Sequence, residues 1–175
     1  MIDVINLQRK VKLETETYRI YVRDLPANVE EAAGKTLSVA FISDRRMKEL
    51  NKLFRGVDAT TDVLSFPHEP DEFKSSGSPT YEGGVDAPSA DGVVLSETAS
   101  ADNELTAVFL GDIVISAELA ERQAIENDLT LENEIKQLIL HGLLHLCGYD
   151  HETDNGEMNA RELDLREQLV LCNLS

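Results

Sequence analysis

The sequence predicts an α+β fold in which a single small mixed β-sheet packs against several helices. Short apolar runs of strand length alternate along the chain with segments whose apolar residues recur at helical spacing. The chain has 175 residues, 42% hydrophobic and 28% charged, which suits one globular domain with its own core. No apolar run approaches the roughly 18 residues of a membrane-spanning helix, so we expect no membrane partner.

The first third of the chain contains two predicted strands and one clear helix. Residues 3–7 and 37–42 are apolar runs of strand length. Residues 18–33 have a mixed pattern that predicts a helix over part of the segment. A further helix is expected directly after the second strand, because apolar residues recur on one helical face there. They are Met47, Leu50, Leu53 and Phe54.

The middle of the chain contains two more predicted strands and a helix. Residues 62–66 and 108–115 have the length and composition of strands. Helical spacing over residues 116–127 predicts a helix after the second of these strands. Ser116 is placed to act as its N-cap.

The last two helices are marked by their capping residues. Thr130 is placed to cap the first of them, and Gly148 can end it in the left-handed conformation. Asp154 or Asn155 can cap the final helix. The apolar residues of that helix share one face: Met158, Leu165, Leu169 and Cys172.

An acidic stretch interrupts this pattern between two strands. Residues 69–104 hold nine acidic residues, one basic residue, Lys74, and thirteen Gly, Ser and Pro residues. Such a segment has too little apolar surface to offset its ordering entropy, so we expect a flexible acidic insertion. We therefore predict one domain over residues 1–175 that carries this insertion, rather than two linked domains.

Charge and cysteine content exclude several classes of protein. The formal net charge is −17, which argues against a DNA-binding protein or a general RNA coat unless positive charge gathers locally. Cys147 and Cys172 are too few and too far apart for a disulfide scaffold. The N-terminus lacks the basic cluster and apolar stretch of a secretory signal. We expect a cytoplasmic protein with reduced thiols.

Three of the four histidines lie within eleven residues, in the sequence HGLLHLCGYDH. His141 and His145 are four residues apart, a spacing that brings both imidazoles to one helical face. Gly148 allows a sharp turn that returns His151 to the same point. A lone histidine, such as His68, is most often an ordinary surface residue. Three in this arrangement predict a metal site.

Three histidine ligands with an open fourth position are typical of a catalytic zinc site. Zinc lowers the pKa of a water molecule in the open position to about 7, so the predicted chemistry is hydrolysis. Nickel, copper and iron also suit three histidines, although one Zn²⁺ ion is preferred. The same histidine spacing occurs in metzincin proteases, which also need Glu directly after the first histidine. Gly142 stands there, so the sequence argues against a protease.

The motif HGLLHLCGYDH resembles the signature of the YbeY family of bacterial endoribonucleases, whose pattern is HGxLHLxGYDH. The resemblance extends to both sides of the acidic stretch. The further matching residues are Leu50, Asn51, Arg55 and Gly56, TDVLSFP at 61–67 and LGDI at 110–113. The first forty residues and the acidic stretch show no match.

The resemblance implies a single-domain α/β fold, one Zn²⁺ held by His141, His145 and His151, and cleavage of single-stranded RNA. It also implies work in rRNA 3′-end maturation and ribosome quality control, with ribosomal RNA, the small ribosomal subunit and assembly proteins as partners. Arg55 and His141 would be the catalytic residues. A guanidinium matches phosphate oxygens and stabilises charge that develops in phosphoryl transfer. From the residues alone, Arg55 could equally be a charge that stabilises a helix C-terminus.

Other polar residues near these motifs are assigned supporting roles. Asp62 and Asp112 are expected to satisfy backbone N–H groups in turns. Ser65 has no histidine partner identifiable in the sequence, so it is not expected to be a nucleophile. Cys147 would lie roughly 200° around the helix from the second histidine and away from the metal. Asp150 is expected to orient a ligand imidazole.

Two alternative functions stay open at this point. A ribosome-assembly factor without catalytic activity could use the metal for structure, although structural zinc sites usually have four ligands. A metal-dependent hydrolase of another ester or amide would fit the same three histidines. The leading hypothesis is a metal-dependent single-strand endoribonuclease.

Overall fold

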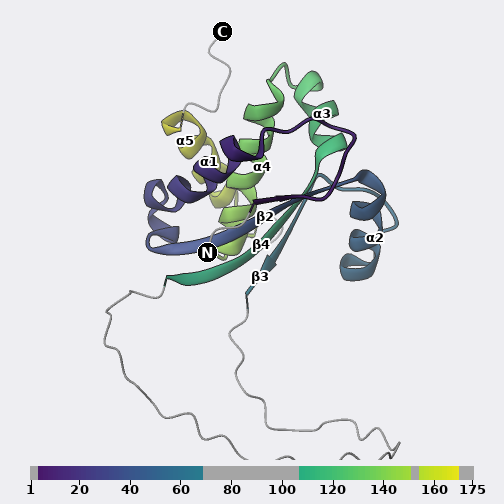
Figure 1. The fold of residues 1–175 in the computed structure, drawn as a ribbon. Coiled ribbons are helices and arrows are strands. Elements are labelled where there is room, and N and C mark those ends of the chain that lie inside the picture. Colours follow the sequence, from purple (N-terminus) through teal and green to yellow (C-terminus); the bar gives the residue numbers. More distant parts are fainter. Residues whose placement is uncertain (1–3, 69–106, 151–153, 170–175) are drawn as a thin grey trace, which may run out of the picture. The chain divides into compact units, whose positions relative to one another are not determined.

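The structure, a computed structural model, describes residues 4–68, 107–150 and 154–169 (Figure 1). The predicted acidic stretch, His151 and Cys172 lie outside these residues. The strands are β1 Val4–Asn6, β2 Lys35–Ile42, β3 Val63–Pro67 and β4 Val108–Ser116. The helices are α1 Thr15–Asn28, the 3₁₀ helix η1 Glu30–Ala32, α2 Asp44–Arg55, α3 Ala117–Glu126, α4 Leu131–Leu146 and α5 Glu157–Gln168.

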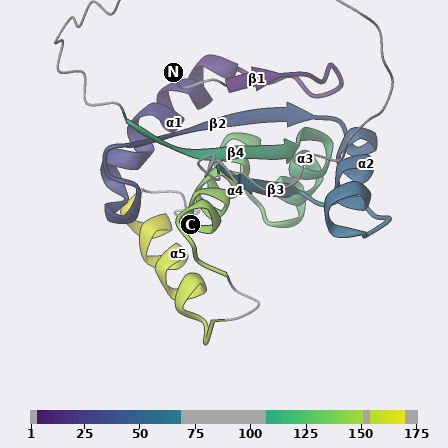
Figure 2. The ribbon, with the colours of Figure 1, turned by 90° about the horizontal axis from the view of Figure 1, so that it is seen from below.

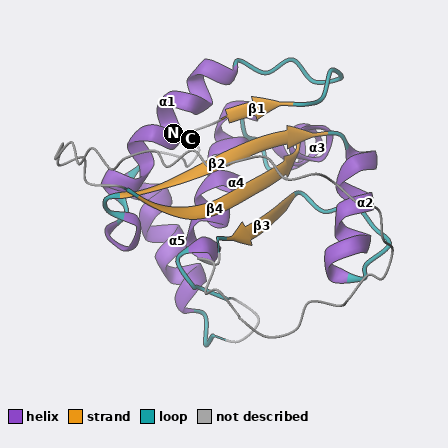
Figure 3. Cartoon of the chain, turned by 60° about the horizontal axis from the view of Figure 1, so that its bottom comes forward, coloured by secondary structure: helices purple, strands orange, loops and turns teal. Residues whose placement is uncertain are grey.

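The strands form one mixed sheet with the order β1-β2-β4-β3, which confirms the predicted fold class. β1, β2 and β4 run parallel, and β3 pairs antiparallel with β4 along the edge. Figure 3 shows the β3 arrow pointing against the other three. An edge strand has only one neighbouring strand, so the other side of β3 is available to line a pocket.

The two faces of the sheet are covered by different helices. Ile113 and Ile115 of β4 are fully buried in the main core cluster, which includes residues of α1, α4 and α5. Val114, between them, points to the opposite face and packs with Met47 of α2 in a smaller cluster. This alternation is the period of two expected for a strand buried on both faces. Figures 1 and 2 show α2 apart from α1, α4 and α5, at one end of the sheet.

Most predicted element boundaries are close to the observed ones, but not every predicted cap makes a capping hydrogen bond. The Thr130 hydroxyl accepts a hydrogen bond from the backbone N–H of Asn133 at 3.1 Å, which confirms that cap. Gly156, and not the predicted Asp154 or Asn155, has the N-cap position of α5, although the carboxylate of Asp154 accepts from the N–H groups of Gly156 and Met158. Ser116 has the N-cap position of α3 but makes no capping bond, because its hydroxyl donates to Asp44.

The apolar face predicted for α2 is only partly buried. Met47 is fully buried and Leu50 half-buried, but Leu53 is 74% exposed and Phe54 60% exposed. Met47 and Leu50 pack with side chains of β3 and β4, whereas in the last turn the exposed ring of Phe54 meets that of Phe66 edge-to-face. None of the helices within the described ranges is long and apolar enough to span a membrane.

Two glycines allow the elements around β3 and α4 to approach closely. Gly111 has φ +140°, and a Cβ there would lie 2.1 Å from the carbonyl oxygen of Phe66. A Cβ on Gly142 would lie 2.9 Å from the side chain of Ile113, so α4 packs closely on the sheet. A side chain at position 142 would therefore point at Ile113 in the core, so this position has no room for the glutamate that metzincins carry.

Candidate functional site

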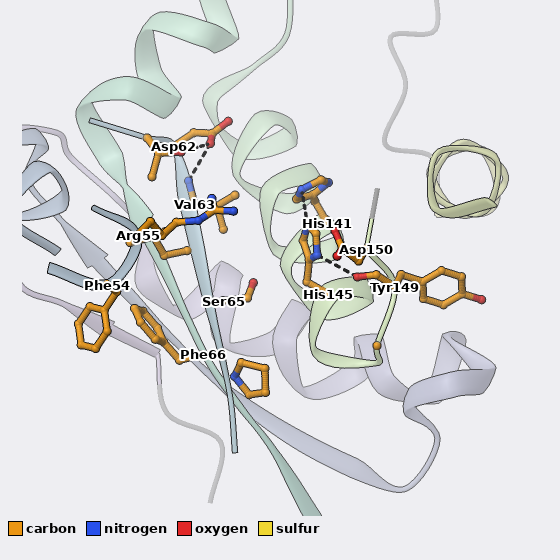
Figure 4. Close-up of a pocket in the computed structure, with 14 residues that line it drawn as sticks. Phe54, Arg55, Asp62, Val63, Ser65, Phe66, His141, His145, Tyr149 and Asp150 are labelled. Carbon is orange, nitrogen blue, oxygen red and sulfur yellow. Dashed lines mark hydrogen bonds between the residues drawn. The ribbon is translucent and has the colours of Figure 1, made fainter. Parts of the chain in front are cut away.

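A cavity of about 760 Å³ lies between the last turn of α2, strand β3 and the C-terminal end of α4 (Figure 4). Its walls combine aromatic, cationic and histidine side chains from segments that are distant in the sequence. The residues that line it are Phe54, Arg55, Thr61, Asp62, Val63, Leu64, Ser65, Phe66, Pro67, His141, His145, Gly148, Tyr149 and Asp150.

His141 and His145 lie one helical turn apart on α4 and point into this cavity (Figure 4). Their Nε2 atoms are 3.1 Å apart, and the ring planes meet at 77°. The His141 side chain is 28% exposed, so the pair is accessible from the cavity. The structure thus confirms that these two imidazoles converge on one point.

Hydrogen bonds at the other ring nitrogens orient both imidazoles. The Nδ1 of His145 lies 2.9 Å from the backbone oxygen of Tyr149, which can only accept, so Nδ1 carries the proton. The Nδ1 of His141 lies 3.0 Å from a carboxylate oxygen of Glu162 on α5. A histidine that donates from Nδ1 in its neutral form presents a lone pair on Nε2.

Glu162 is ionised, which makes the Nδ1 of His141 a donor as well. Burial alone would raise the pKa of the Glu162 carboxyl, but the hydrogen bond with His141 and the charge of Arg166 outweigh burial and lower the pKa. The two Nε2 atoms face each other at 3.1 Å, a contact that is a hydrogen bond when one of them carries a proton. A cation bound by both nitrogens would take the place of that proton. Two nitrogens bound to one zinc at 2.0–2.1 Å in tetrahedral geometry stand about 3.3–3.4 Å apart, so the pair fits such an ion.

Glu162 is the site residue that the sequence analysis missed. It lies 21 residues after His141, in a helix in which half of the side chains are acidic or basic, so a single carboxylate carries no distinguishing signal. A carboxylate that accepts from the second nitrogen of a histidine is typical of metal sites, where it orients the ligand. The sequence predicts this role for Asp150, which lines the cavity beside the histidines.

The predicted third ligand is not placed. Within residues 4–68, 107–150 and 154–169, no group of three or more His, Cys, Asp or Glu side chains is arranged to hold a metal ion. His151 lies outside these ranges, directly after Asp150. The structure therefore brings two of the three predicted ligands together, and the role of His151 stays a prediction.

Arg55 lines the same cavity from the opposite wall (Figure 4). It is the last residue of α2 and is followed by the C-cap residue Gly56, which has φ +71°. The two roles considered for Arg55 are thus compatible, because a cation at this helix end also faces the histidine pair across the cavity. The guanidinium on that wall suits an anionic ligand, and the two imidazoles on the other wall suit a cation.

Comparison with known proteins identifies the family of this chain. A profile of the family described as endoribonuclease YbeY matches residues 3–170, nearly the whole chain. The chain belongs to the YbeY family. A relative named endoribonuclease YbeY from Thermodesulfovibrio yellowstonii is 30% identical over 186 residues, covering 99% of this chain and 96% of that protein. One from Thermoanaerobacter is 36% identical over 174 residues, covering 99% and 91%.

The fold is also found in a protein of known structure. A solution structure of a protein from Thermotoga maritima superimposes with a TM-score of 0.54 and 25% identity, covering 97% of this chain and 89% of that one. The resemblance inferred from HGLLHLCGYDH is therefore confirmed as family membership. The members share the name of an endoribonuclease, a class of hydrolase that cleaves RNA internally.

The polar residues given supporting roles make structural contacts in this YbeY-family chain. Asp62 accepts from the backbone N–H of Val63 at 2.8 Å, as predicted. Asp112 accepts instead from the hydroxyl of Ser38 on the neighbouring strand. The Ser65 hydroxyl donates to the carbonyl of Gly142 at 3.2 Å, which holds β3 against α4.

Two further residues behave as the sequence analysis expected. Cys147 packs against the main core cluster, and its burial raises the pKa of the thiol, which keeps it protonated at neutral pH. His68 is exposed just after the end of β3, where its ring meets that of Phe109 edge-to-face at 5.4 Å. Neither residue lines the histidine cavity.

A cluster formed by Glu31, Arg161 and Tyr149 supports the turn that follows α4. The carboxylate of Glu31 accepts two hydrogen bonds from Arg161 of α5, at 2.9 and 3.0 Å. It also accepts one from the hydroxyl of Tyr149 at 2.9 Å. Hydrogen bonds from Arg161 lower the pKa of Glu31 to about 2, against the opposing effect of burial, with a further contribution from Tyr149. Glu31 thus ties η1 to the residue whose carbonyl orients His145.

Ionisation of Glu31 should make the free energy of unfolding depend on pH in the acidic range. Because its pKa falls from 4.5 to about 2 on folding, the stabilisation is complete above pH 4.5 and is lost as the pH falls towards 2. The Glu31 side chain is 26% exposed, so we discount for solvent screening and expect about 1–2 kcal/mol. The free energy of unfolding, measured with urea, should decrease less between pH 7 and pH 3 for Glu31→Gln than for wild type. The exposed neighbour Glu30, changed to Gln, is the control, and equal losses in all three proteins would contradict the prediction.

Proposed function

We propose that this chain is a metal-dependent single-strand endoribonuclease that acts in rRNA 3′-end maturation and ribosome quality control. The observation that carries the proposal is the convergence of the Nε2 atoms of His141 and His145 at 3.1 Å in a cavity that Arg55 also lines. Membership of the endoribonuclease YbeY family supports RNA cleavage. The remaining parts of the proposal are carried over to this chain from the family resemblance. They are ribosomal RNA as the substrate, the small subunit and its assembly proteins as partners, and a cytoplasmic location.

The proposed cofactor is one Zn²⁺ ion held by His141, His145 and His151. When bound, zinc would supply a Lewis acid for a phosphoryl oxygen and for a water molecule. The residues of the chain prepare the site for it. Glu162 and the Tyr149 carbonyl hold both imidazoles in the tautomer that presents Nε2 to the cavity.

The proposed role of Arg55 is to bind the scissile phosphate from the wall of the cavity that faces the histidines. Its planar donors match two phosphate oxygens, and its charge would stabilise the negative charge that develops as the phosphodiester bond breaks. Asp62 and Ser65 line the same cavity, but their side chains form hydrogen bonds with the backbone of Val63 and Gly142. They shape the wall and are not proposed to move protons.

The geometry favours catalysis over a purely structural metal. Structural zinc sites are closed, with four protein ligands and little access for other molecules. His141 instead is 28% exposed and faces a cavity of about 760 Å³ together with His145 and Arg55. An assembly factor without catalytic activity would not need this opening.

The proposal is tested by measuring zinc content, thermal stability and cleavage of a single-stranded RNA oligonucleotide before and after chelation. We expect about one zinc per chain, loss of cleavage on chelation and recovery when zinc is restored. Cleavage that survives complete removal of the metal would overturn the metal-dependent mechanism. A large loss of stability on chelation, with no RNA cleavage at any stage, would instead support the assembly-factor alternative.

Glu162 should strengthen zinc binding without touching the ion. Changing Glu162 to Gln keeps its shape but weakens the acceptor for His141 Nδ1, and loss of such a partner typically costs about 10–100-fold in metal affinity. Competition with a fluorescent zinc chelator would measure this change. Glu167 is exposed on the same helix, so Glu167→Gln is the matched control. Equal zinc affinity in wild type and Glu162→Gln would show that Glu162 has only a structural role.

A further inference from the structure

Phe54 is an exposed aromatic residue at the cavity, and the proposed reaction does not use it. It lies at the end of α2, 60% exposed, immediately before Arg55. Its ring meets that of Phe66 on β3 edge-to-face, with centroids 5.0 Å apart and planes at 71°. Both rings line the cavity that holds the histidine pair (Figure 4).

Exposure by itself would explain nothing, because single apolar side chains are common on protein surfaces. Leu53 provides the comparison within the same helical turn. It is 74% exposed but lies outside the residues that line the cavity. Phe54 differs because its ring is held by Phe66 and faces the site. An edge-to-face contact occupies at most one face of a ring, so the other face of Phe54 is available to a ligand.

The charge of the chain gives a reason for such a surface. Proteins that bind single strands combine phosphate contacts with stacking of bases on aromatic rings. This chain has a net charge of −17, so phosphate contacts over its general surface are unfavourable. On α2 itself, the cations before Arg55 form ion pairs with acidic neighbours. The pairs are Arg45 and Arg46 with Glu49, and Lys48 and Lys52 with Asp58.

Stacking supplies RNA affinity that does not depend on phosphate charge. A base stacks through its π-face whatever its identity, and only an unpaired base can offer that face. Arg55 follows Phe54 in the chain and lines the same cavity as the histidines. A nucleotide whose base lies on Phe54 would therefore lie in the cavity that Arg55 and the histidine pair also line.

We propose that Phe54, supported by Phe66, is a stacking subsite for an unpaired nucleobase next to the scissile phosphate. The inference rests on the proposed endoribonuclease function and adds to it a physical basis for preferring single strands. It assigns to Phe54 a role in binding the substrate rather than in the chemical step.

Steady-state cleavage of a single-stranded RNA oligonucleotide tests the subsite. We expect Phe54→Ala to raise KM by about 5- to 100-fold, the range that stacking of one base supports, with kcat within about twofold of wild type. Phe54→Leu should resemble Phe54→Ala, because leucine fills space but has no π-face. Phe54→Trp should retain a KM close to that of wild type. Leu53→Ala, at the neighbouring exposed position outside the cavity, is the control and should leave both constants unchanged.

A fluorescence measurement reports stacking without relying on cleavage. The chain contains no tryptophan, so the variants Phe54→Trp and Leu53→Trp each carry a single indole probe, in adjacent positions. Rapid mixing with the single-stranded oligonucleotide should quench the fluorescence of Phe54→Trp saturably before cleavage proceeds. The same oligonucleotide in a duplex should leave the fluorescence of Phe54→Trp unchanged. Neither form of the RNA should quench the fluorescence of Leu53→Trp.

The outcomes separate this inference from the proposed function. Suppose that wild type cleaves RNA but either Phe54→Ala or Phe54→Leu has the KM of wild type. The stacking subsite is then overturned and the endoribonuclease function stands. Equal quenching by single-stranded and duplex RNA would also overturn the subsite. If wild type does not cleave RNA and the fluorescence of Phe54→Trp is not quenched, both proposals fail together.

Discussion

Replacing His145 by alanine is expected to remove zinc from the site and to reduce RNA cleavage by at least about 100-fold. The Nε2 of His145 is one of the two ring nitrogens that converge in the cavity, and alanine leaves His141 without its neighbour at 3.1 Å. Metal affinity then falls steeply, and with it the electrophilic contribution to phosphodiester cleavage. Metal analysis of the purified variant and single-turnover cleavage of an RNA oligonucleotide measure the two effects.

His68 offers a matched control for this experiment. It is the fourth histidine of the chain, exposed just after the end of β3 and outside the residues that line the cavity. His68→Ala should keep both the zinc content and the cleavage rate of wild type. Wild-type zinc content in His145→Ala would show that the predicted ligand set is wrong. Equal cleavage by wild type, His145→Ala and His68→Ala would point to a different active site or a contaminating nuclease.

The second large effect is expected at Arg55, where alanine should lower kcat by about 10²–10³-fold while the zinc content stays at the wild-type level. Donors that stabilise developing charge in a transition state typically contribute this much. Arg55→Lys should recover only part of the activity, because an ammonium keeps the charge but loses the planar pair of donors. Single-turnover cleavage under saturating RNA measures the chemical step, and metal analysis verifies that the ion is retained.

The alternative role of Arg55, as a cation at the end of α2, predicts a different result. In that case alanine would lower stability by about 0.3–1 kcal/mol and leave cleavage unchanged. Lys52 provides the control, since it lies in the same last turn, pairs with Asp58 at 3.4 Å and lies outside the cavity lining. Lys52→Ala should leave kcat at the wild-type value. Equal kcat in Arg55→Ala and Lys52→Ala would remove Arg55 from the proposed mechanism.

The local part of the site could be predicted from the sequence. His141 and His145 share a face because residues four apart on any α-helix do so. Thr130 and Gly148 bound that helix through hydrogen bonds and backbone conformation that involve only nearby residues. The family resemblance began with the motif HGLLHLCGYDH, whose first six residues lie in α4, and extended to TDVLSFP at 61–67 and LGDI at 110–113.

The burial of α2 could not be predicted in the same way. Helical spacing correctly placed Met47 in contact with the sheet, but Leu53 and Phe54 have the same spacing and remain exposed. Periodicity shows which residues share a face of the helix, but how far the neighbouring sheet extends along that face depends on strand pairing between distant segments. The exposed ring of Phe54, which we propose as a stacking subsite, is therefore visible only in the folded chain.

By itself, the sequence determined the α+β class, most of the helix and strand boundaries, the helical pair of histidines and the family. Each of these depends on residues close together in the chain, whose geometry follows from backbone periodicity and capping. Only the tertiary structure revealed Glu162 behind His141, Arg55 across the cavity, and Ile113 against Gly142. These contacts join segments separated by tens of residues, and their formation depends on how the helices pack on the two faces of one sheet.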